Sequence, residues 1–190
     1  MRLVDLIEGY RDWIKEQNET GMDVYLVTFQ FNHISANQKT ALDIMSKEIE
    51  RFYVVLLSDV VRRPRRAAHL ANLPQLIAIP DRPTSKRVTT HRLSDIRPND
   101  GVHFHVFLAV PQVSRLECDL IGHIYQNKKR YLGNQGKIMK IDVRPVEDLD
   151  GGLVDYTFKH IKRRSFSLDD ILILPKSQSE LEPKSLWVTK

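Results

Sequence analysis

Apolar and polar residues alternate along this chain with two different periods, one typical of helices and one typical of strands. Apolar residues recur every three or four positions in four segments: 3–20, 38–57, 116–125 and 153–163. Runs rich in β-branched and aromatic residues, typical of strands, occur in four others: 24–31, 73–79, 101–110 and 138–144. Pro80 is expected to stop the second strand, and the polar, proline-containing segment 81–100 predicts a loop. The order of elements predicts an α+β fold with a central antiparallel sheet flanked by helices.

The strand predicted at 101–110 carries two histidines, His103 and His105, within an otherwise apolar run. Side chains alternate between the faces of a strand, so both imidazoles point to one face while Phe104 points to the other. Imidazole is a common ligand of divalent transition metals, and the pair therefore predicts half of a metal site. A histidine on a strand is more often a surface or hydrogen-bonded core residue, so the prediction depends on its neighbours.

Length and composition are typical of one globular domain. The chain has 190 residues, of which 42% are hydrophobic and 28% charged, and we expect one domain over 1–175 with a polar tail over 176–190. No apolar stretch is long enough to span a bilayer, and acidic residues interrupt the first ten positions where a signal peptide needs an apolar core. Cys118 is the single cysteine, which excludes an internal disulfide and fits a reducing compartment. We expect a cytoplasmic protein without a membrane partner.

Positive charge is concentrated in clusters rather than spread evenly. The net charge is +5, and the basic residues gather in three groups: Arg62, Arg63, Arg65 and Arg66; Lys128, Lys129 and Arg130; and Lys159, Lys162, Arg163 and Arg164. Such groups supply sequence-independent affinity for nucleic-acid phosphates, although a charge run is often only a solvated surface. The first two clusters, with Lys162 and Arg163 of the third, are the candidate nucleic-acid contacts.

One tyrosine lies on the polar side of a predicted basic helix. In segment 153–163, an apolar stripe consists of Val154, Phe158 and Ile161. About 100° per residue places Tyr156, Lys159, His160 and Arg163 on the opposite side of an ideal helix. Tyr125 and Tyr131 are the rival tyrosines: they flank the basic cluster 128–130 and could instead stack on the bases of a single strand.

Three segments, in this order, resemble the three motifs of the HUH endonucleases, the rolling-circle replication initiators (Rep proteins) with a single catalytic tyrosine. They are the strand Tyr25–Phe29, the pair His103 and His105, and the helical segment from Tyr156 to Lys159. The resemblance spans about residues 24–164. It implies an RRM-like or ferredoxin-like sheet and metal-dependent nicking and joining of single-stranded DNA.

The resemblance also implies roles for individual residues. Tyr156 would be the nucleophile that forms a 5′-phosphotyrosine link, and Lys159 would stabilise phosphate charge or help position the metal. His103 and His105 would hold Mg²⁺ or Mn²⁺. Family sites generally add a third ligand, and Asp81 is our choice. The alternatives are Gln75, His33, His69, His91 and Asp95.

The partners implied are single-stranded DNA or an origin hairpin, in rolling-circle replication or the transfer of a plasmid, phage or other mobile element. A host helicase would separate the strands, because the chain has no Gly-rich phosphate loop with Lys-Ser/Thr. Two other classes of function remain open. One is a non-catalytic nucleic-acid-binding protein with the same fold, and the other is a metalloenzyme that acts on a small molecule.

Overall fold

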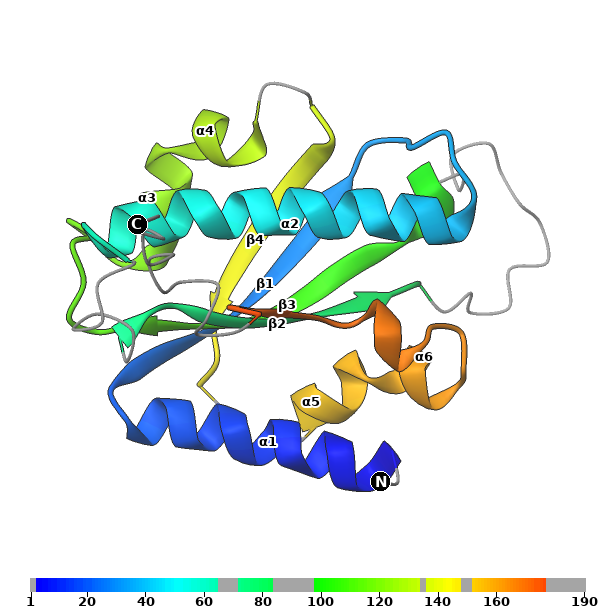
Figure 1. The fold of residues 1–190 in the computed structure, drawn as a ribbon, viewed down its shortest axis with the longest axis horizontal. Helices are drawn as coiled ribbons and strands as arrows, with labels where there is room; N and C mark the ends of the chain where they lie inside the picture. The colour runs from blue at the N-terminus through cyan, green and yellow to red at the C-terminus, as the bar shows by residue number, and fades with distance from the viewer. Residues whose placement is uncertain (1–2, 65–71, 84–97, 134–135, 148–151, 177–190) are drawn as a thin grey trace, which may run out of the picture.

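A computed structural model gives the fold and describes residues 3–64, 72–83, 98–133, 136–147 and 152–176 (Figure 1). Five strands form one antiparallel sheet in the order β4-β1-β3-β2-β5. The helices are α1 (Leu3–Glu19), α2 (Gln38–Val60), α3 (Leu120–Gln126), α4 (Lys128–Leu132), α5 (Gly152–Thr157) and α6 (Lys159–Lys162). The strands are β1 (Met22–Phe31), β2 (Gln75–Asp81), β3 (His103–Pro111), β4 (Ile138–Pro145) and β5 (Leu172–Leu174). The predicted α+β fold, an antiparallel sheet flanked by helices, is confirmed.

Helices cover both faces of the sheet. In Figure 1, α2, α3 and α4 lie on one face, and α1, α5 and α6 lie on the other. None of the helices described is long and apolar enough to cross a membrane. All residues of β3 after His103 are buried, because β3 lies in the middle of the sheet with helices on both sides.

The alternation of side chains decides which face receives the histidines. Phe29 and Phe104 lie directly opposite each other on β1 and β3, so they share a face. Phe29 packs edge-on against Phe52 of α2, with ring centroids 4.9 Å apart. His103 and His105 alternate with Phe104 and therefore point to the other face, which carries α1, α5 and α6.

Two of the element boundaries that differ from those predicted have a local cause. Strand β2 continues through Pro80 to Asp81, so the expectation that Pro80 stops it is wrong. β5 pairs only with the part of β2 from Leu76 to Ala78, so one side of β2 is open at Pro80 and the missing N–H donor is tolerated there. Helix α3 begins at Leu120 rather than near residue 116, because the side chain of Asp119 accepts a hydrogen bond from Gly122 N and caps the helix.

The helix predicted over 153–163 is two short helices. Phe158, with φ −86° and ψ 3°, separates α5 from α6, and its side chain is fully buried. The predicted apolar stripe of Val154, Phe158 and Ile161 is buried as expected. The break ends the regular rotation of about 100° per residue. His160, expected on the polar side with Tyr156, is consequently buried.

Candidate metal centre

A carboxylate and two imidazoles meet on the face of the sheet that carries α5 and α6. Asp81, the last residue of β2, lies directly opposite His103 on β3, so the two side chains share a face. His105, two residues further along β3, points the same way. Asp81 Oδ2 lies 3.4 Å from His103 Nε2 and 3.2 Å from His105 Nε2, and the two Nε2 atoms are 3.3 Å apart. These three residues each offer one ligand atom within 4.8 Å of the others and could hold a metal ion.

Both imidazoles are oriented through their other ring nitrogen. His103 Nδ1 lies 2.9 Å from the carbonyl oxygen of Gly101, and a carbonyl can only accept, so Nδ1 carries the hydrogen. In the neutral ring, Nε2 then has a free lone pair that points at the centre. His105 Nδ1 lies 3.2 Å from Thr28 Oγ1 on β1, which orients the second ring in the same way. Metal-binding histidines are usually held by such a contact at their second nitrogen.

Asp81 is ionised despite its burial. Its side chain is 1% exposed. Burial alone would raise the pKa of its carboxyl group, but the neighbouring His103, His105 and Lys159 outweigh burial and hold the pKa well below its ordinary value. A buried carboxylate is costly unless it is paired or binds a cation, and the groups around Asp81 supply that pairing.

Helix α6 reaches both oxygens of Asp81 with two consecutive residues. Lys159 Nζ lies 2.9 Å from Oδ2, and His160 Nε2 lies 3.3 Å from Oδ1. Burial would lower the pKa of Lys159, but contact with Asp81 and Tyr156 raises it above the ordinary value, so the ammonium is charged. Burial lowers the pKa of His160, which favours its neutral ring.

Tyr156 lies at the open side of this cluster. Its side chain is 53% exposed, and its ring centroid is 6.0 Å from that of His105. Lys159 Nζ lies over the same ring, 3.7 Å from its centroid. An accessible phenol, a cation and the candidate ligand set therefore lie together.

The donor set fits a divalent ion. Two imidazole nitrogens and one carboxylate oxygen match the ligands that Mn²⁺, Fe²⁺ or Zn²⁺ accept. The expectation of a metal site formed by Asp81, His103 and His105 is supported to this extent, and nothing in the geometry selects one metal.

Of the other proposed third ligands, only Gln75 and His33 lie among the described residues, and neither is part of the group. Gln75 lies six residues before Asp81 on β2, which is about 20 Å away at ~3.3 Å per residue. His33 follows β1 and is not among the described residues that meet at the centre. His69, His91 and Asp95 lie outside the described residues.

The basic clusters are divided between the two ends of α2. Arg62 and Arg63 are exposed just after α2, whose 23 residues span about 34 Å at 1.5 Å each. The beginning of α2 follows β1 at the end of the sheet where His103 lies, so these arginines are remote from the centre. Arg65 and Arg66 lie outside the described residues. Lys162 and Arg163 are exposed and adjoin the centre through α6, although Lys162 pairs with Asp155 at 2.7 Å.

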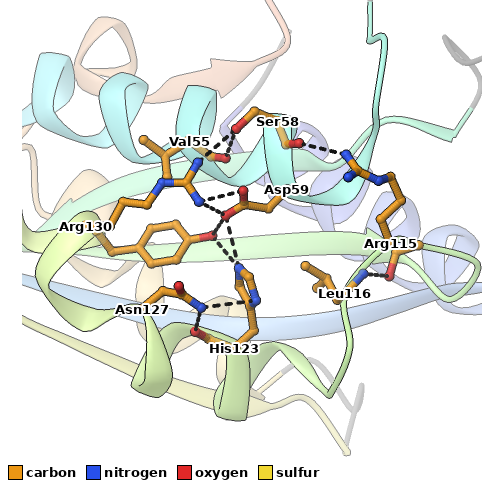
Figure 2. Close-up of polar contacts among 10 residues, drawn as sticks. Val55, Ser58, Asp59, Arg115, Leu116, His123, Asn127 and Arg130 are labelled. Carbon is orange, nitrogen blue, oxygen red and sulfur yellow. Dashed lines mark hydrogen bonds and ion pairs between the residues drawn. The ribbon is translucent and has the colours of Figure 1, made fainter.

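The second basic cluster, residues 128–130, contributes Arg130 to a second polar network, on the opposite face of the sheet (Figure 2). Asp59 near the end of α2 accepts hydrogen bonds from Arg130 at 2.7 Å and 2.8 Å and from the Tyr131 hydroxyl at 2.9 Å. His123 Nε2 lies 3.1 Å from the same carboxylate. Tyr131 is fully buried, so the interpretation that it stacks on bases is wrong. Tyr125, 80% exposed, remains available for stacking.

Two residues of the centre were missed from the sequence. Thr28 lies within the strand predicted at 24–31 but was given no role, and only the β1–β3 register brings it beside His105. His160 follows Lys159 directly, and helical periodicity gave it an exposed position. No family model, curated protein or solved structure matches the chain, so the interpretation of this centre depends on its own geometry.

Proposed function

We propose that this protein nicks and joins single-stranded DNA with the help of a divalent metal ion, as an HUH-type strand transferase. The observation that carries the proposal is the position of Tyr156, an exposed phenol beside His105 and under the Lys159 ammonium. A tyrosine with only a structural role has no need of a neighbouring candidate ligand set. Nucleophile, cation and metal ligands in one place are the parts that phosphodiester transfer requires.

In the proposed reaction, Tyr156 Oη attacks the scissile phosphorus in line with the 3′-oxygen. The new bond joins phosphorus to the tyrosine oxygen, and the bond to the 3′-oxygen breaks. The phenol gives up its proton, and the departing 3′-oxygen gains one, so charge and atoms balance. The 5′-phosphotyrosine keeps the energy of the original ester, so attack by a free 3′-hydroxyl reverses the step and joins strands.

Asp81, His103 and His105 would hold the metal, which would polarise the phosphate and neutralise its developing charge. Lys159 lies close enough to the Tyr156 ring for its ammonium to stabilise the phenolate as the proton leaves. Its contact with Asp81 keeps this ammonium in place. Lys159 would therefore stabilise the nucleophile, whereas the two histidines would hold the metal that acts on the phosphate.

A polar strip beside the centre offers a path for the DNA strand. Asp81 and His103 are paired on adjacent strands, and the same row of paired positions continues to Gln30 of β1 and Lys140 of β4. All of these side chains lie on one face of the sheet. Gln30 is exposed, and the side chain of Lys140 is more than half exposed. A backbone phosphate bound at Lys140 would lie in line with the metal centre. The clusters at the far end of α2 would then bind flanking DNA through its phosphates.

The proposed role is initiation of rolling-circle replication or transfer of a mobile element, with a host helicase to open the duplex. The competing function, a nucleic-acid-binding protein without catalysis, shares the sheet and the basic clusters but forms no covalent product. A covalent adduct separates the two.

The test is incubation of the protein with Mn²⁺ and a pool of labelled single-stranded oligonucleotides, followed by denaturing electrophoresis. We expect a metal-dependent protein–DNA band that Tyr156→Phe reduces by at least about 100-fold without weakening DNA binding. Tyr10→Phe is the matched control, because it removes a phenol hydroxyl from a ring that packs on Phe158 in the same layer, 5.1 Å between centroids.

Three results would contradict the proposal in different ways. An adduct that persists in Tyr156→Phe would show that another residue is the nucleophile. DNA binding without an adduct, across several sequences and metals, would favour the non-catalytic function. Metal binding without any DNA binding would favour a metalloenzyme for small molecules.

A further inference from the structure

The two oxygens of Asp81 face different groups. Oδ2 lies within 3.4 Å of His103 Nε2, His105 Nε2 and Lys159 Nζ. Oδ1 faces away from the histidine pair and lies 3.3 Å from His160 Nε2. The carboxylate plane is therefore fixed between the candidate metal ligands on one side and α6 on the other.

His160 is buried between Asp81 and the backbone of Arg82. Its side chain is 7% exposed, so water has little access to the ring. Its ring is 6.2 Å from that of Phe166, centroid to centroid, in an environment that an apolar side chain would fill at lower cost. Asp81 is the one carboxylate within ion-pair distance of His160 among the described residues.

We propose that His160 is a positioning residue of the metal centre: it holds Oδ1 of Asp81 so that Oδ2 faces the Nε2 atoms of His103 and His105. The inference rests on the proposed metal site and adds a residue to it. His160 is not itself in the set whose ligand atoms lie within 4.8 Å of one another, so it acts through Asp81. Outer residues that orient a ligand in this way typically change metal affinity about 10–100-fold when they are replaced.

The placement on α6 gives this contact a second consequence. Lys159 and His160 are consecutive in the sequence and contact different oxygens of the Asp81 carboxylate. These two contacts connect α6, the helix after Tyr156, to the end of β2. A rotation of the Asp81 side chain would break both contacts together. His160 thereby keeps the ligand and the nucleophile in one arrangement.

The experiment measures the dissociation constant of Mn²⁺ for the DNA-free protein by calorimetry, with the Co²⁺ absorption spectrum as a record of coordination. His160→Leu removes the contact, and His160→Gln replaces it, because the Gln side-chain nitrogen can reach the position of His Nε2. His123→Leu is the matched control: it removes a partly buried imidazole that contacts an aspartate, Asp59, at 3.1 Å on the opposite face (Figure 2). Circular dichroism establishes that each variant is folded at the assay temperature.

We expect His160→Leu to raise the Mn²⁺ dissociation constant about 10–100-fold and to alter the Co²⁺ spectrum. His160→Gln should recover most of the affinity, and His123→Leu should bind Mn²⁺ as the unmodified protein does. If His160→Leu folds and keeps its Mn²⁺ affinity and Co²⁺ spectrum, the inference about His160 is overturned. The proposed metal centre is not contradicted by that result.

If His160→Leu does not fold, His160→Gln and His160→Asn take its place, because the shorter amide of Asn cannot reach Oδ1. Weaker Mn²⁺ binding by His160→Asn alone supports the inference, and equal binding by both variants overturns it. An unmodified protein that binds no Mn²⁺ or Co²⁺ would overturn the metal centre itself, a result distinct from a failure of His160 alone.

Discussion

At the scale of single residues, a partly buried aspartate, Asp59, and a buried one, Asp81, show how a structural carboxylate differs from a candidate ligand. Asp59 accepts hydrogen bonds from Arg130 on both oxygens and from Tyr131 on one of them, and it also contacts His123. Asp81 instead lies within 3.4 Å of three imidazoles and the Lys159 ammonium. A network of hydrogen bonds around a carboxylate rigidifies a fold, whereas a carboxylate that shares a buried site with imidazole nitrogens is a candidate metal ligand.

Asp59 should stabilise the protein only while it is ionised. Burial raises its pKa, but hydrogen bonds from Arg130, Tyr131 and His123 outweigh burial and lower it below the ordinary value. A lowered pKa in the folded state means that the stabilisation is fully present above the unfolded pKa, about 4, and is lost as pH falls below it. Asp59→Asn should therefore lower the free energy of unfolding by about 1–3 kcal/mol at pH 7 and by progressively less toward pH 3.

Urea unfolding at pH 7, 5 and 3 measures this difference. Asp43→Asn is the control, because it removes an exposed carboxylate from the same helix without breaking a buried network. A difference between the unmodified protein and Asp59→Asn that stays constant from pH 7 to pH 3 would contradict the assignment.

At the scale of elements, the sequence predicted what depends on local periodicity. The strands β1, β3 and β4 follow from β-branched and aromatic runs, and the shared face of His103 and His105 follows from alternation alone. The third ligand, Asp81, was chosen because it follows a predicted strand. The break at Phe158 could not be predicted, because the apolar stripe continues through it and the Phe158 ring packs on Tyr10 of α1, a contact between segments far apart in the sequence.

The short helices α3 and α4 are held to α2 by the network around Asp59, and their sequences contain little sign of it. His123 lies in α3, Tyr131 in α4 and Asp59 in α2, so three elements meet through one carboxylate (Figure 2). The same network engages Arg130, half of whose side chain is exposed. The positive charge of Arg130 is therefore partly neutralised by its ion pair with Asp59.

Loss of the Tyr131 hydroxyl should destabilise the contact between α2, α3 and α4. Tyr131→Phe keeps the buried ring against Phe52, 5.1 Å between centroids, and removes the donor to Asp59. We expect the free energy of unfolding to fall by about 1–2 kcal/mol, because the carboxylate loses one partner in a buried place. Tyr125→Phe, on exposed surface of α3, should change it by less than about 0.5 kcal/mol. Equal effects of the two substitutions in chemical denaturation would exclude the proposed role of the Tyr131 hydroxyl.

At the scale of the whole molecule, the candidate centre exists only after folding. Asp81 and the two histidines come from adjacent strands, and the residues that flank them come from β1 and α6. Sequence analysis could nominate most of these residues separately. It could not show which oxygen of Asp81 faces which neighbour, because that depends on the register of β2 and β3 and on the turn between α5 and α6.

A metal that needs this assembled set should bind the folded chain in preference to the unfolded chain and therefore stabilise it. At a free Mn²⁺ concentration about 100 times the dissociation constant, the stabilisation should be about 2.7 kcal/mol. For a chain of this size, that corresponds to a rise in melting temperature of about 5–10 °C, measured by differential scanning calorimetry and reversed by EDTA. His103→Ala should remain folded and lose most of the rise, because it removes one of three ligands. A rise of the same size in His103→Ala would show that Mn²⁺ stabilises the protein at another place.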